Sequence, residues 1–134
     1  MPSLMKISRQ AFDDMLNQAR AELPNESCGY LLGQGDFVTQ NFKMTNVDHS
    51  EEHFSFDPAE QFSAIRFARK EGLQVVGNWH SHPTSPSRPS QEDIRLANDP
   101  NIVYFILSLA EAEPVLNAFQ IKAGQVEKRS LEIV

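Results

Sequence analysis

The sequence predicts one domain of the α/β (α+β) class, with a mixed β-sheet flanked by helices. The chain has 134 residues, of which 40 % are hydrophobic, and this length and composition suit a compact domain with one core. Segments with helical periodicity alternate along the chain with short apolar runs that are typical of strands. Because such an order favours helices packed on a sheet, we expect residues 1–134 to fold as a single domain.

The first predicted elements are an amphipathic helix over residues 9–22 and a β-hairpin over residues 28–42. In the hairpin, short apolar runs lie around Gly33 and Gly35, which suggests two strands joined by a tight turn. In the helix, which follows Ser8, apolar side chains recur at the i, i+3, i+4 and i+7 spacing of one helical face. Those side chains are Phe12, Met15, Leu16, Ala19 and Leu23.

The second predicted helix, over residues 58–71, has well-marked ends. Asp57 can cap its N-terminus, Pro58 suits its first position, and Gly72 suits the position after its last turn. The remaining elements are predicted from short apolar or alternating segments. They are a strand over 73–82, a short helix over 90–99 and three strands over 101–110, 114–121 and 126–134.

Charge and composition argue against several classes of protein. The net charge is −6 and the basic residues are scattered, whereas a nucleic-acid-binding protein shows clustered basic charge. The first ten residues hold no apolar stretch of signal-peptide length, and no segment approaches the roughly 20 apolar residues that span a bilayer. We therefore expect a cytoplasmic protein without a nucleic-acid or membrane partner. With Cys28 as the only cysteine, any zinc ion would be held mainly by nitrogen and oxygen.

A possible metal site begins at the end of the predicted strand over 73–82. His80 and His82 lie two residues apart, so their side chains leave an extended strand on the same face. A catalytic zinc ion needs three protein ligands and an open fourth position. Three prolines restrict the following loop, after which Ser90 can cap a helix and Asp93 lies on its first turn. A carboxylate at Asp93 could point back towards the two histidines.

Each half of this pattern also has a simpler interpretation. Ser90 and Asp93 fit a capping box, in which both side chains bind backbone N–H groups and no ligand. A His-x-His pair is likewise common on exposed strand ends. If the two halves act together, we expect Asp93 to face the metal and to leave capping mainly to Ser90.

The combined spacing resembles a known family. The JAMM (MPN+) zinc metalloproteases share the signature H-x-H, seven residues, S, two residues and D. The segment "HSHPTSPSRPSQED" matches this signature and looks like the bacterial stand-alone members even in its proline positions. The resemblance implies a single-domain, cytidine-deaminase-like JAMM fold. It also requires an upstream acid, and Glu26 in "PNESCGYLLG" stands where the family has its catalytic glutamate. Glu22 competes, but it falls in the last turn of the predicted first helix, where a surface acid is expected. Glu51, Glu52 and Glu60 belong to no motif.

The resemblance implies the roles of the site residues. His80, His82 and Asp93 would bind one Zn²⁺, Glu26 would take a proton from the attacking water and return it to the leaving amine, and Ser90 would donate a hydrogen bond to the oxyanion. Outside the motif, Asn78 is a candidate for orienting a ligand or substrate, because it shares the face of the histidines. We expect Cys28 to be a buried strand residue, Trp79 a core residue, and His49 and His53 surface residues.

The family implies an amide or isopeptide hydrolase. Members of similar size, the sulfur-carrier-protein (CysO-cysteine) peptidases, act on small ubiquitin-like (ThiS/MoaD-like) sulfur carriers, in one case releasing cysteine from the carrier's C-terminus. The chain is too short for the insertions that grip polyubiquitin. Two alternatives stay open, namely a non-catalytic MPN scaffold and a cell-wall or phage-tail peptidase of the same superfamily.

Overall fold

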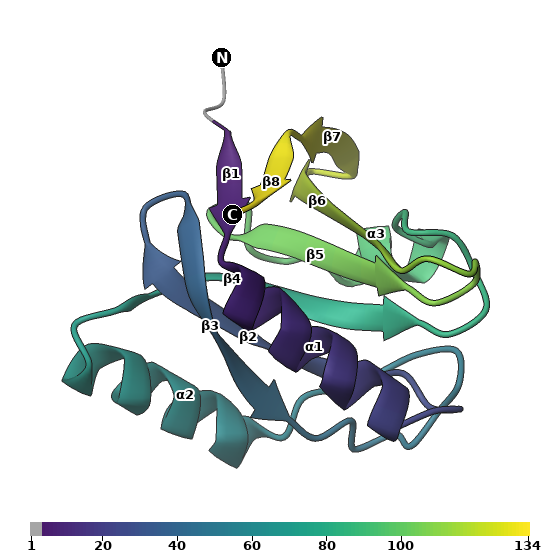
Figure 1. Cartoon of the computed structure of the whole chain (residues 1–134), viewed down its shortest axis with the longest axis horizontal. Coiled ribbons are helices and arrows are strands. Elements are labelled where there is room, and N and C mark those ends of the chain that lie inside the picture. The colour runs from purple at the N-terminus through teal and green to yellow at the C-terminus, as the bar shows by residue number, and fades with distance from the viewer. Residues whose placement is uncertain (1–3) are drawn as a thin grey trace.

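A computed structural model describes residues 4–134 as an eight-stranded mixed sheet flanked by helices (Figure 1). The strands lie in the order β7-β6-β5-β4-β2-β3-β1-β8. The elements along the chain are β1 (Met5–Ile7), α1 (Arg9–Ala21), β2 (Cys28–Gln34), β3 (Phe37–Met44), α2 (Pro58–Lys70), β4 (Gln74–His82), α3 (Gln91–Leu96), β5 (Val103–Ser108), β6 (Val115–Lys122), β7 (Gln125–Arg129) and β8 (Leu131–Ile133).

Local sequence signals account for the first two helices and the hairpin. The Ser8 side chain accepts a hydrogen bond from a backbone N–H of α1, Asp57 does the same for α2, and Pro58 occupies the first position of α2. Gly72 after α2 and Gly35 in the β2–β3 turn have positive φ angles of 70° and 56°, which glycine adopts without steric cost. The predicted helices over 9–22 and 58–71 and the hairpin over 28–42 are confirmed.

The two faces of the sheet carry different layers. In Figure 1, α1 crosses in front of the sheet and α3 lies behind it. The main core forms beneath α1, where Phe12 and Met15 pack with Trp79 and Phe105. A smaller apolar cluster lies beneath α3 and consists of Ile106, Phe119 and Ile121, with Ile94, Ala97 and Tyr104 packed against it. The predicted sheet flanked by helices is thus confirmed, and Trp79, with none of its surface exposed, is a core residue as expected.

Strand β4 lies near the middle of the sheet and positions the site. It runs antiparallel to β2 and parallel to β5, with Cys28, His80 and Ile106 in one row across the three strands. A loop then leads from His82, the last residue of β4, to α3, which covers the face of the sheet opposite to α1. The side chains of β4 that face α3 therefore lie between a sheet and a helix.

Two sequence predictions were wrong at the end of the chain and at α3. The single strand predicted over 126–134 is two strands, because β7 pairs with β6 at one edge while β8 pairs in parallel with β1, itself not predicted, at the other. The helix predicted over 90–99 ends at Leu96. Asp99 precedes Pro100, a position that disfavours helical backbone, and its N–H donates to the hydroxyl of Tyr104.

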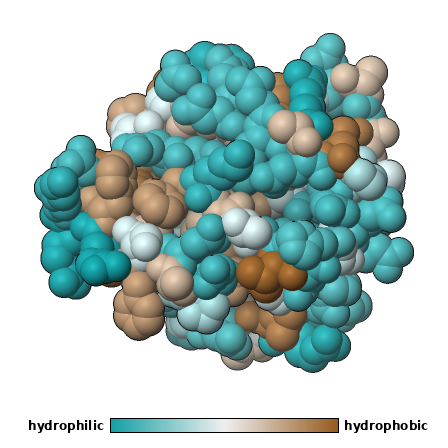
Figure 2. Space-filling view, turned by 90° about the horizontal axis from the view of Figure 1, so that it is seen from below, coloured by the Kyte–Doolittle hydropathy of each residue, from teal (hydrophilic) through white to brown (hydrophobic). Residues whose placement is uncertain are grey.

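The surface seen from below in Figure 1 is largely hydrophilic, with separate apolar patches (Figure 2). On α2, Phe62 is 68 % exposed and Ile65 is 41 % exposed. Among residues 4–134, none of the helices combines the length and the apolar character that crossing a membrane requires.

Candidate metal centre and active site

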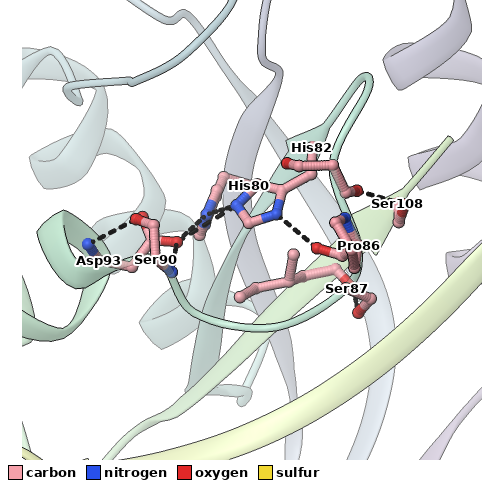
Figure 3. A network of polar contacts seen from close by, with 9 residues as sticks. His80, His82, Pro86, Ser87, Ser90, Asp93 and Ser108 are labelled. Carbon is pink, nitrogen blue, oxygen red and sulfur yellow. Dashed lines mark hydrogen bonds and ion pairs between the residues drawn. The ribbon is translucent and has the colours of Figure 1, made fainter. Parts of the chain in front are cut away.

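Three predicted ligands converge at the C-terminal end of β4 (Figure 3). Nε2 of His80 and Nε2 of His82 lie 3.1 Å apart. Both nitrogens approach the same carboxylate oxygen, Oδ2 of Asp93, at 3.1 and 3.2 Å respectively. The two imidazoles are 4 % exposed and the carboxylate comes from the first turn of α3. The fold therefore brings together the two halves of the sequence pattern.

Neighbouring groups hold both imidazole rings in place. Nδ1 of His82 lies 2.8 Å from the carbonyl oxygen of Pro86, so this nitrogen donates and Nε2 presents its lone pair, the usual arrangement of a metal-binding histidine. The loop that carries Pro86 is itself fixed, because the hydroxyls of Ser108 and Ser87 donate to the carbonyls of Ser85 and Ile106. The ring of His80 stacks on Phe54, with ring centroids 4.6 Å apart.

Asp93 serves the helix and the ligand cluster at the same time. Its Oδ2 accepts a hydrogen bond of 2.9 Å from the Ser90 backbone N–H, while the Ser90 hydroxyl oxygen accepts from the Asp93 N–H at 3.0 Å. The capping box is therefore complete. The expectation that Asp93 would leave capping mainly to Ser90 was wrong, since a single carboxylate oxygen can accept from the N-cap and still face both histidines.

The electrostatics of the cluster suit a cation. Burial lowers the pKa of His80, and Asp93 opposes this effect. Burial also acts to lower the pKa of His82, but hydrogen bonds to Asp93 and to the Pro86 carbonyl outweigh it and the pKa is raised. For Asp93, burial acts to raise the pKa, and the hydrogen bonds from the two histidines hold it well below its usual range. The carboxylate is thus ionised beside two imidazole nitrogens.

This donor set fits Zn²⁺. The three ligand atoms all lie within 4.8 Å of one another, and two histidines with one carboxylate are a common ligand set for catalytic zinc. Because Nδ1 of His82 donates to the Pro86 carbonyl, Nε2 of the neutral ring is an acceptor. This Nε2 lies 3.2 Å from Oδ2 of Asp93. Two facing acceptors are satisfied by a proton or by a metal cation between them, so this position is one that a cation can fill.

Glu26 lies just before β2 and is held against β4. It is 4 % exposed, and its Oε1 has no hydrogen-bond partner among the described residues. The next residue, Ser27, exchanges two hydrogen bonds with Ser81, which lies between the two histidines: the Ser27 N–H donates to the Ser81 hydroxyl at 2.7 Å, and the Ser81 N–H donates to the Ser27 carbonyl at 3.0 Å. Burial raises the pKa of Glu26 to about 8, against the opposing charge of His82. A carboxyl group with such a pKa can take up and release a proton near neutral pH.

The competing candidates lie in less suitable surroundings. Cys28 is fully buried, and burial raises the pKa of its thiol to about 12, which leaves a structural role as expected. His49 and His53 are exposed, and His53 pairs with Asp48 at 3.1 Å. Glu22 caps the C-terminus of α1.

Glu60 is also engaged elsewhere, because it accepts hydrogen bonds from the N–H and hydroxyl of Thr45.

Sequence reasoning missed two residues of the site, Phe54 and Pro86. The signal for Phe54 was the apolar pair in "FSFDP" directly before α2, which has no place on a helix or strand.

Comparison with known proteins places the chain in a family. A family model described as prokaryotic homologs of the JAB domain matches residues 8–122. The chain belongs to this family. The resemblance to the JAMM metalloproteases that the sequence suggested is thereby confirmed.

Two curated relatives match most of the length of this prokaryotic JAB protein. The CysO-cysteine peptidase of Mycobacterium tuberculosis is 28 % identical over 123 residues, which cover 90 % of this chain and 84 % of the relative. The desampylase of Haloferax volcanii is 34 % identical over 113 residues, which cover 79 % of this chain and 81 % of the relative.

Solved structures share the fold. A solution structure of a protein from Desulfitobacterium hafniense is 43 % identical and superposes with a TM-score of 0.90, covering 98 % of this chain and 93 % of the other. A crystal structure of a JAB1/MPN domain protein from Archaeoglobus fulgidus is 24 % identical, with a TM-score of 0.66 and coverage of 98 % and 100 %. The predicted JAMM fold is therefore confirmed.

Proposed function

We propose that this protein is a zinc-dependent peptidase that hydrolyses the amide bond at the C-terminus of a small ubiquitin-like sulfur carrier. One observation carries the proposal: His80, His82 and Asp93 converge on one point, and Glu26, whose buried Oε1 has no partner among the described residues, directly precedes Ser27, which is hydrogen-bonded to the strand that carries both histidines. His80, His82 and Asp93 would hold the zinc ion. When bound, Zn²⁺ polarises a carbonyl group and lowers the pKa of water.

The chain's own residues supply the proton transfers. Glu26 accepts a proton from the water that attacks the amide carbonyl and then gives a proton to the leaving amine. Its pKa, raised by burial to about 8, suits a group that must both hold and release a proton near neutrality. Because water is the nucleophile, the reaction needs no covalent intermediate on the enzyme.

Ser90 is proposed to stabilise the oxyanion. Its oxygen already accepts the Asp93 N–H, but the hydroxyl hydrogen has no assigned acceptor among the described residues and is free to donate to the substrate. The residue is exposed and stands at the end of the loop that faces the histidines. Removal of an oxyanion donor typically costs about 100- to 1,000-fold in rate.

The relatives support the class of substrate. One is named for a conjugate of cysteine with CysO and another is a desampylase, and a third, in Thermus thermophilus, is a probable TtuB-protein conjugate cleaving protease. These names favour a small protein substrate with a C-terminal amide bond. Release of cysteine from the carrier is the particular reaction that the mycobacterial relative suggests.

The test is hydrolysis of a carrier conjugate by the zinc-loaded protein. Sulfur carriers that bear a C-terminal cysteine or a short C-terminal peptide are incubated with the enzyme, and the intact masses are measured. We expect the carrier to lose the extension with wild-type protein and to stay intact with Glu26→Gln, which should still bind zinc. Unchanged masses with every carrier, in protein shown to hold zinc, would contradict the proposal. Hydrolysis by Glu26→Gln would remove Glu26 from the role of base.

A further inference from the structure

A hollow of about 330 Å³, open to solvent, lies beside His80 on the face of the sheet that α3 covers. This volume is within the range of ligand pockets. Its lining is mainly aromatic and aliphatic, and includes Tyr30, Phe54, Phe56, Tyr104 and Ile106. Neither lysine nor arginine lines it, whereas three acidic residues do. The lining therefore favours an uncharged apolar group and disfavours an anion.

The floor of this hollow is a row of three side chains across the sheet. Asn78 of β4 lies in register with Tyr30 of β2 on one side and with Tyr104 of β5 on the other. Both tyrosine hydroxyls have partners in the walls: the Tyr30 oxygen accepts from Gln61 at 2.9 Å, and the Tyr104 hydroxyl donates to the Asp99 carbonyl at 3.2 Å. The floor is thus built and held by its surroundings.

One polar atom of the floor has no partner. Oδ1 of Asn78 is buried and accepts no hydrogen bond from the described residues. A buried acceptor without a donor costs about 1–3 kcal/mol, so natural proteins rarely keep one without a reason. An N–H group entering the hollow would satisfy this oxygen. The expected occupant therefore combines an apolar side chain with a backbone N–H.

The position of Glu26 indicates which part of the substrate enters. Glu26 borders a separate hollow of about 420 Å³ together with Glu22, Asn46 and His49, and does not line the one beside His80. Under the proposed function Glu26 gives a proton to the leaving amine, so the amine side of the bond must lie by Glu26. The acyl side, which belongs to the carrier, is left with the hollow that His80 and Asn78 line.

We propose that Tyr30, Asn78 and Tyr104 form an acyl-side subsite. This subsite takes an uncharged apolar side chain from the C-terminal segment of the carrier, while Oδ1 of Asn78 accepts a backbone N–H of the same segment. Asn78 is then a substrate-contacting residue that determines specificity. The assignment of the acyl side rests on the proposed function.

The first test measures peptide binding to the metal-free protein by ¹H–¹⁵N NMR titration. The probes are acetylated alanine hexapeptide amides that end in two glycines, with leucine or glutamate placed in turn at each of the other four positions. At one position we expect leucine to bind about 10-fold more tightly than alanine, and glutamate to bind more weakly than alanine. Equal binding of the leucine and glutamate peptides at all four positions would overturn the proposal.

The second test pairs Asn78 with the peptide backbone. Methylation of the peptide nitrogen that donates to Asn78 should weaken binding to the wild type about 5-fold, the effect of one lost hydrogen bond, and should leave binding to Asn78→Leu unchanged. Asn17→Leu, at an exposed position on α1 outside the lining of the hollow, should behave as the wild type. Equal losses in the wild type and Asn78→Leu would overturn the contact. The methylation scan on unaltered protein decides the question even if Asn78→Leu fails to fold, since tolerance of methylation at every position contradicts a bond to Asn78.

These binding measurements are independent of hydrolysis. If the leucine preference appears but no carrier conjugate is cut, the pocket stands and the proposed reaction fails. If conjugates are cut but the metal-free protein shows neither the leucine preference nor the methylation effect, the reaction stands and the subsite fails.

Discussion

The two faces of strand β4 differ in how their polar groups are satisfied. On the face towards α1, the Trp79 indole N–H donates to Asn41 at 2.9 Å, and Asn41 in turn donates to Gln18. On the face towards α3, Oδ1 of Asn78 has no partner among the described residues, and His80 and His82 crowd one carboxylate oxygen. Along this one strand, the polar group that faces α1 has its hydrogen-bond partner within the protein, whereas Oδ1 of Asn78, which faces α3, has none among the described residues.

Within the nine residues of β4, one face thus serves the stability of the fold and the other face carries the candidate site. The core face follows the general rule that buried polar groups are paired. The opposite face departs from that rule only where a cation or a substrate would supply the missing partner, which is how functional sites commonly differ from the rest of a fold. If this account is right, substitutions on the core face should change stability, and substitutions on the other face should change binding.

The largest expected effect is loss of zinc on removal of one imidazole. His82→Ala should weaken zinc binding by at least about 100-fold, since even residues behind the ligands contribute 10- to 100-fold, and should abolish hydrolysis. Competition with a chromophoric chelator measures the affinity. His53→Ala is the matched control, because His53 also lies 3.1 Å from a carboxylate but on an exposed segment. Equal zinc affinity in the two variants would contradict the ligand assignment.

On the core face we expect a change in stability without a change in zinc binding. Asn41→Ala leaves the buried Trp79 N–H without an acceptor and Gln18 without a donor, which should cost about 1–3 kcal/mol in the free energy of unfolding. Urea unfolding measures the cost, and one zinc ion per chain should still bind. Asn98→Ala, at an exposed position, should change stability by less than about 0.5 kcal/mol. Loss of zinc in folded Asn41→Ala would break the distinction between the faces.

A smaller, pH-dependent effect is expected for Glu26 in the metal-free protein. Its pKa is raised by burial to about 8, so between about pH 4.5 and 8 the unfolded chain has released a proton that the folded chain keeps. The free energy of unfolding therefore falls as pH rises through this range. Glu26→Gln removes this loss and should be more stable than the wild type by about 1 kcal/mol or more at pH 8, with little difference near pH 4.5.

Unfolding curves of the chelator-treated wild type and Glu26→Gln across this range give the measurement. Glu51→Gln, which removes an exposed carboxyl group, controls for the loss of one charge. A stability difference that does not grow with pH would show that Glu26 is not held in its protonated form.

Local signals made some parts of the molecule predictable and left others hidden. Helix α2 followed from Asp57, Pro58 and Gly72 because caps act within a few residues. Strands β1 and β8 each have three residues, too few for a period, and they form by pairing with each other across the length of the chain. No local pattern could have predicted that pairing.

The candidate site shows the same division. His80, His82, Ser90 and Asp93 were predicted from spacing, and the fold brings the two histidines and Asp93 together. The shared use of one Asp93 oxygen by cap and histidines could not be predicted, since it depends on where the loop places α3. The stacking of Phe54 on His80 likewise joins segments that no sequence spacing relates.

The ligand set itself is the central claim, and X-ray absorption at the zinc K-edge of the zinc-loaded protein tests it most directly. The account predicts a first shell of nitrogen and oxygen only, at about 2.0–2.2 Å, with the outer-shell scattering of two imidazoles. A sulfur shell near about 2.3 Å, or scattering from fewer than two imidazoles, would contradict binding by His80, His82 and Asp93.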